Sequence, residues 1–79
     1  MDRYEFLLEM DQILGLSPGT IRGNERLEDL QNWDSMSLVT FIALAESNSG
    51  VRVSPNQVVA CTTVADLMKL ANAEMSLQR

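Results

Sequence analysis

Apolar side chains near the start of the chain recur at the spacing of an amphipathic helix. Within the stretch DRYEFLLEMDQILGL, residues 2–16, four of them share one helical face: Phe6, Met10, Ile13 and Leu14. Gly15 and the turn residues at 17–19, Ser-Pro-Gly, favour an end to the helix. The pattern therefore predicts a first helix that buries one of its sides.

The next segment, residues 17–33, lacks this periodicity. Its glycines, its proline and its charged residues argue against a long helix, while Leu27 and Leu30 have the character of anchors to a core. Ordered loops of this length are uncommon and are often functional. We predict a long ordered loop after the first helix.

Helical spacing returns in a second apolar run, formed by Leu38, Phe41, Ile42 and Ala45. Asp34 and Ser35 come just before this run, where short oxygen-bearing side chains cap helices. Gly50 supplies a stop. The second helix is predicted to begin at Asp34-Ser35 and to extend to about Ser49.

Two capping patterns follow the short apolar piece VRV. Residues 54–57, Ser-Pro-Asn-Gln, predict a brief third helix through Ala60. Residues 63–66 repeat the pattern before a fourth helix, whose apolar face comprises Val64, Leu67, Met68, Ala71 and Met75. The predicted fold is all-α, a four-helix bundle with a long first loop and a short third helix, in a single domain of residues 1–79.

The charge of the chain is negative and uneven. Its 79 residues include six basic and eleven acidic side chains, for a formal net charge of −5. A negative charge repels nucleic acid and anionic membrane surfaces. Eight acids and three bases lie in residues 1–34, whereas residues 35–79 carry three of each. We expect a monomer that binds neither nucleic acid nor membrane.

The sequence favours a cytoplasmic protein. No apolar run approaches the roughly 20 residues that span a bilayer, and the acidic start MDRYEFLLEM lacks the basic region of a signal peptide. The single cysteine, Cys61, cannot form an internal disulfide, and without histidine the chain has no zinc-type spacing. We therefore expect no metal, and we expect Cys61 to be a small buried or half-buried residue.

The Asp34-Ser35 pair admits two interpretations. It can simply cap a helix, or Ser35 can present its hydroxyl at a helix start, where backbone N–H groups favour an attached phosphate. If Asp34 is the cap, the Ser35 hydroxyl remains uncommitted. The chain has no histidine, and no lysine lies near Ser35 in sequence to act as its base. We expect no catalytic residue and no enzyme, but Ser35 could be the substrate of another enzyme.

A second apolar line lies beside the core stripe of the predicted second helix. It comprises Met36, Val39 and Ala43, and Glu46 is the one acid of this helix. These apolar side chains either complete the core or form a docking surface for a partner, with Glu46 beside it.

These residues together resemble the acyl carrier protein family. Asp34-Ser35-Met36 opens the second helix, after LEDLQNW and before TTVADLMKL, and the likeness covers nearly the whole chain. The resemblance implies that a phosphopantetheinyl transferase attaches phosphopantetheine covalently to Ser35, with Asp34 as its cap and positioning residue. It also implies a thioester-linked cargo, loaded by an acyl- or aminoacyl-loading enzyme and passed to an acyl-transferring or condensing enzyme. A shelter for an acyl chain is then expected between the second and third helices, near Phe41, Ile42, Val58 and Val59.

Some positions depart from carriers of fatty acid synthesis, which usually have a run of acids along the second helix. Ser37 and Thr40 occupy such positions, and we expect both to be exposed. Trp33 replaces a usually small residue and either anchors the loop on the bundle or contacts a partner. The departures favour a specialised acyl carrier, in fatty acid or polyketide biosynthesis, over a housekeeping one. The alternatives are an aminoacyl or peptidyl carrier serving an adenylating enzyme, and an unmodified helical interaction module.

Overall fold

The computed structural model describes residues 2–71 and is helical throughout its regular elements. Its elements are α1 (Arg3–Leu14), the short 3-10 helix η1 (Leu27–Asp29), α2 (Ser35–Ser49), α3 (Pro55–Val59) and α4 (Val64–Leu70). Over this range there is no strand, only an isolated bridge between Arg26 and Thr63. The prediction of four helices, with a long first loop and a short third helix, is confirmed. Met75, predicted on the fourth helix, lies outside the described residues.

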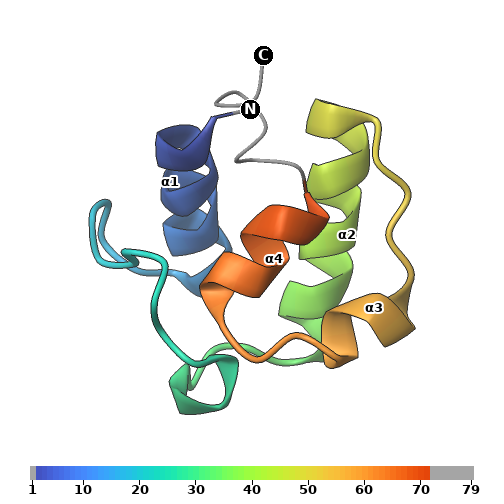
Figure 1. Ribbon diagram of the computed structural model, residues 1–79. Coiled ribbons are helices and arrows are strands. Elements are labelled where there is room, and N and C mark those ends of the chain that lie inside the picture. The colour runs from blue at the N-terminus through green and yellow to red at the C-terminus, as the bar shows by residue number, and fades with distance from the viewer. Residues whose placement is uncertain (1, 72–79) are drawn as a thin grey trace.

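The helices pack around one apolar core. Figure 1 shows α1 and α2 running in opposite directions, with α4 crossing in front of them and α3 beside the start of α2. The rings of Phe6 on α1 and Phe41 on α2 meet edge to face, with centroids 6.1 Å apart. The largest fully buried apolar side chains are Phe6, Phe41, Met10, Leu67, Met68, Val58 and Val64. Among the predicted stripe residues, Ile13, Leu38 and Ile42 are only half-buried.

The helix ends follow the local signals in the sequence. Three helices begin with a reciprocal capping box, formed by Asp2 with Glu5, Ser54 with Gln57 and Thr63 with Asp66. Gly15 and Gly50 end α1 and α2 in the left-handed conformation, with φ of 72° and 68°. None of the helices in residues 2–71 is long and apolar enough to cross a membrane.

The long loop is ordered by a buried carboxylate that the helical pattern did not reveal. Asp11 is 1 % exposed, and its two oxygens accept the N–H groups of Gly19 and Ile21, each at 2.8 Å. Further along, Leu27 donates to the carbonyl of Thr62 at 2.9 Å, and Val64 donates to that of Glu25 at 3.0 Å. The loop therefore joins the end of α1 to the start of α4. Leu27 is buried and Leu30 half-buried, as expected for anchors.

Candidate functional site

The start of α2 is built around Asp34. This residue has extended backbone angles, and its Oδ1 accepts the N–H of Ser37 at 3.0 Å. The backbone N–H and then the hydroxyl of Ser37 hold the pKa of the Asp34 carboxyl below its usual range. Asp34 is therefore a charged cap at neutral pH.

Ser35 is the first residue of α2 and is exposed. Across residues 2–71, no side-chain hydrogen bond engages its hydroxyl, because Asp34 and not Ser35 supplies the cap. The positive end of the helix dipole lies at this point and favours an attached anion. The arrangement leaves a free hydroxyl that an external enzyme can reach.

Ser37 differs from the expectation of an exposed side chain. It is only 6 % exposed, and its Oγ lies 2.6 Å from the carbonyl oxygen of Asn32 and 3.1 Å from Oδ1 of Asp34. The side chain turns back over the helix start because two acceptors lie there. Asn32 was missed from the sequence altogether, since a side chain that meets an irregular backbone leaves no periodic signal. Thr40 is exposed, as expected.

The second apolar line lies on the outer side of α2. Met36 is 76 % exposed and Val39 is 63 % exposed, while Ala43 and Glu46 are also exposed. These four residues, called here the α2 surface, therefore do not complete the core. The side chains near the expected acyl shelter are divided: Phe41 and Val58 are buried, Ile42 is half-buried, and Val59 faces solvent. Val59 thus adds an apolar side chain on α3.

The two residues of open role, Trp33 and Cys61, are both half-buried. The Trp33 ring packs against Phe41 edge to face, at a centroid distance of 6.5 Å, which fits the packing anchor. The Cys61 thiol donates to the carbonyl of Gln57 at 3.4 Å. Burial, and then the charge of Asp66, raise the pKa of this thiol. Cys61 is therefore protonated at neutral pH and poorly suited to act as a nucleophile.

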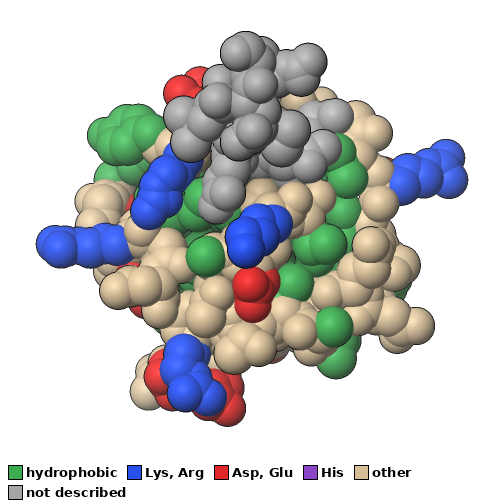
Figure 2. Space-filling model, viewed as in Figure 1, with side chains coloured by type: hydrophobic (Ala, Val, Ile, Leu, Met, Phe, Trp, Pro, Cys, Tyr) green, Lys and Arg blue, Asp and Glu red, His purple; other side chains and the backbone are tan. Residues whose placement is uncertain are grey.

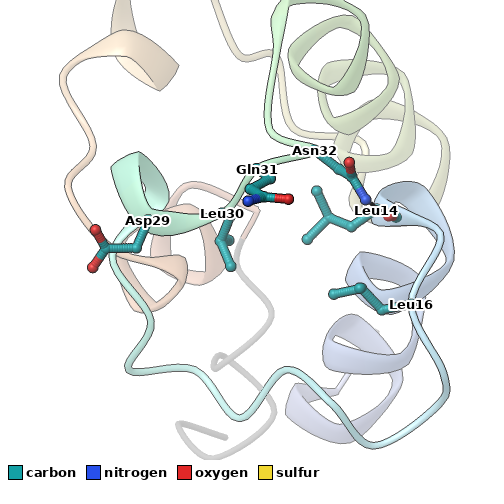
Figure 3. A pocket seen from close by; sticks show the side chains of 6 residues that line it. All are labelled: Leu14, Leu16, Asp29, Leu30, Gln31 and Asn32. Carbon is teal, nitrogen blue, oxygen red and sulfur yellow. Dashed lines mark hydrogen bonds between the residues drawn. The ribbon is translucent and has the colours of Figure 1, made fainter.

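Two hollows flank the end of α1 close to the candidate site. One, of about 400 Å³, extends from Ile13 and Leu14 to Met36 and Ser37. The other, of about 190 Å³, lies under η1, and Figure 3 shows Leu14, Leu16 and Leu30 directed into it. Both include Asn32. The segment before Ser35 therefore lies between the two hollows and lines part of each.

A family model described as phosphopantetheine attachment site matches residues 9–71. The chain belongs to this family. Its members are carriers that hold phosphopantetheine covalently and are themselves non-catalytic, and they generally work with a phosphopantetheinyl transferase and acyl-processing enzymes. Neither the curated proteins nor the solved structures gave a match.

The carrier offers a residue that fits its prosthetic group. Attachment requires a hydroxyl that the transferase can reach, and Ser35 supplies one at the positive end of α2. Ser37, the neighbouring hydroxyl in the same turn, is buried and already hydrogen-bonded. The group, when bound, supplies a terminal thiol for thioester formation, so the chain needs no reactive cysteine of its own.

Proposed function

We propose that Ser35 bears the phosphopantetheine arm and that the chain is a specialised acyl carrier. The observation that carries this proposal is the exposed, uncommitted hydroxyl of Ser35 beside the capping residue Asp34. The transferase would join Ser35 Oγ to the phosphorus of phosphopantetheine from coenzyme A. The bond from that phosphorus to the 3′,5′-ADP portion breaks, the nucleotide leaves, and a base of the transferase takes the hydroxyl proton.

The surface around Ser35 supports a specialised pathway. Glu46 is the only charged residue on α2, and the α2 surface otherwise offers Met36, Val39 and Ala43. A carrier recognised by a basic partner would present several carboxylates there. We infer that the loading enzyme and the downstream acyl-transferring or condensing enzyme recognise the chain through apolar contacts. We infer further that the chain is a monomeric, cytoplasmic carrier of fatty acid or polyketide synthesis.

An aminoacyl or peptidyl carrier for an adenylating enzyme is the second candidate. The same weakly charged α2 supports it, because nothing in that surface selects an acyl partner over an adenylating one. An unmodified interaction module is disfavoured by membership of the attachment-site family. Loading rates separate the first two: an amino acid loaded far faster than any acyl chain would establish the aminoacyl carrier.

The attachment residue can be tested by intact-mass analysis after incubation with a broad-specificity phosphopantetheinyl transferase and coenzyme A. We expect one added phosphopantetheine, located on Ser35 by fragmentation and absent from Ser35→Ala. Ser47→Ala is the matched control, because Ser47 is another exposed serine of α2 and should leave modification intact. An unmodified wild-type chain, or an arm on another residue, would refute the proposal.

A further inference from the structure

A chain of three polar contacts connects the end of α1 with the first turn of α2. The Asn32 side-chain amide donates to the carbonyl of Leu14 at 2.6 Å, and the Asn32 carbonyl accepts the Ser37 hydroxyl at 2.6 Å. Asp34 Oδ1 then accepts the N–H of Ser37 at 3.0 Å. Figure 3 shows the Asn32 amide directed toward the end of α1, where Leu14 lies. The segment that bears Ser35 is thus tied on both sides.

The groups in these contacts have few alternative hydrogen-bond partners in the protein or in water. Leu14 is the last residue of α1, so its carbonyl has no partner within the helix. Ser37 has a single hydroxyl proton, and the carbonyl of Asn32 is the closer of its two acceptors. Because Ser37 is 6 % exposed, water has little access to its hydroxyl and does not readily replace this contact.

The Ser35 side chain has no comparable restraint. Among residues 2–71 nothing holds its hydroxyl, so its position depends on the backbone between Asn32 and Ser37. The Trp33 ring packs on Phe41 within the same segment, and the Trp33 backbone N–H donates to the carbonyl of Leu30 at 3.1 Å. The backbone is therefore fixed where the side chain is free.

We propose that Asn32 and Ser37 are positioning residues, which hold the Ser35 backbone so that its hydroxyl meets the transferase in one orientation. This inference rests on the proposed attachment at Ser35. Neither residue touches the reacting atoms: both act through the backbone of the intervening turn. A nucleophile that is held in place reacts faster than one that must find its orientation, and small misplacements have large effects on rate.

The test is the steady-state kinetics of phosphopantetheine transfer to the apo carrier. We expect Ser37→Ala and Asn32→Ala each to lower kcat roughly 10-fold with little change in KM, because orientation and not docking is lost. The double variant should be no slower than either single variant, since both break one connected unit. Gln31→Ala is the control: Gln31 is exposed in the same segment and makes no side-chain hydrogen bond within residues 2–71.

A conservative variant separates positioning from general stability. Ser37→Thr keeps the hydroxyl, and the hollow of about 400 Å³ beside it leaves room for the extra methyl group, so its kcat should return to near the wild-type value. If Ser37→Ala does not fold by circular dichroism, Ser37→Cys takes its place, with a smaller loss expected because a thiol is a weaker donor.

Unchanged kcat in the folded variants, a loss confined to KM, or a Ser37→Thr variant as slow as Ser37→Ala would each overturn the positioning role. Failure of the attachment proposal is distinct, because the wild-type chain would then be unmodified or modified elsewhere.

Discussion

The loop between α1 and α2 and the outer face of α2 distribute polar and apolar groups in opposite ways. The loop is held by the buried Asp11 carboxylate of α1, which accepts the N–H groups of Gly19 and Ile21. On α2, Met36 and Val39 are exposed to solvent. Buried polar groups give order when every partner is present, whereas exposed apolar groups gain stability only when another surface covers them. The loop therefore has its polar partners within the chain, whereas the α2 surface is the face that we propose for contact with a partner.

The largest effect should come from placing a charge on the α2 surface. We expect Met36→Asp or Val39→Asp to weaken binding to the downstream enzyme by several kcal/mol, because the new carboxylate would be desolvated in the contact. Glu46→Ala should cost under about 1 kcal/mol, as a rim charge does. Calorimetric affinities across a salt series would measure both effects.

The same titrations can contradict the expectation that apolar contact dominates binding. If apolar contact dominates, affinity falls only modestly as salt screens the charges. A steep salt dependence, with Glu46→Ala as the most damaging change, would instead assign recognition to electrostatics. Figure 2 shows basic and acidic side chains scattered over the face that includes α4, with a basic and an acidic group side by side at its centre, so the coloured part of that face offers no single block of charge for steering.

The stabilisation of the long loop can be tested by substituting Asp11. Asp11→Ala should lower the free energy of unfolding by about 2–3 kcal/mol, because two N–H groups lose a charged acceptor. Asp11→Asn should fall in between, since the amide keeps one acceptor oxygen. Urea denaturation would measure the change, with Gln12→Ala, an exposed neighbour on α1, as the control. Equal losses of unfolding free energy for Asp11→Ala and Gln12→Ala would show that Asp11 does not stabilise the loop.

The smallest effect concerns the loss of folding stability at acid pH. The pKa of Asp34 is lowered in the folded protein, chiefly by the N–H of Ser37, so its contribution to stability is present above the unfolded pKa. That contribution is lost as pH falls through the folded pKa. Asp34→Asn keeps a good cap but cannot titrate, so its unfolding curve should depend less on pH below about 4 than that of the wild type.

Urea midpoints between neutral and acid pH would show this difference. Asp66 and Glu25 also have lowered pKa values, so the dependence should shrink without vanishing. Asp29→Asn serves as a control, because its exposed side chain makes no hydrogen bond within residues 2–71. If Asp34→Asn and Asp29→Asn change the acid response equally, the contribution is not specific to the cap.

The sequence predicted what depends on neighbours along the chain. The caps at Asp34, Ser54 and Thr63 involve residues three positions apart, so a short motif carries their whole geometry. The stops at Gly15 and Gly50 are equally local. The short 3-10 helix η1 was not predicted, because its three residues lie in a loop without periodicity.

In the candidate site, too, the local features could be predicted from the sequence and the features that depend on other segments could not. The free hydroxyl of Ser35 follows from Asp34 as cap, which the sequence could predict. The burial of Ser37 could not be predicted, because it depends on where the Asn32 carbonyl lies in an irregular segment. Helical periodicity alone left Met36 and Val39 as either core or surface, and only the packing of α1 and α3 on the other side of α2 resolved them.

The pairing of the long loop with the start of α4 has a consequence for motion. A helix as short as α4, seven residues, has little stability alone and depends on what it packs against. Because Leu27 and Val64 donate across to Thr62 and Glu25, α4 cannot detach without releasing the loop, and the loop cannot detach without releasing α4. Their backbone amides should therefore share one opening event. We expect partial opening to involve instead the five-residue α3, which packs against α2 and takes no part in these two hydrogen bonds.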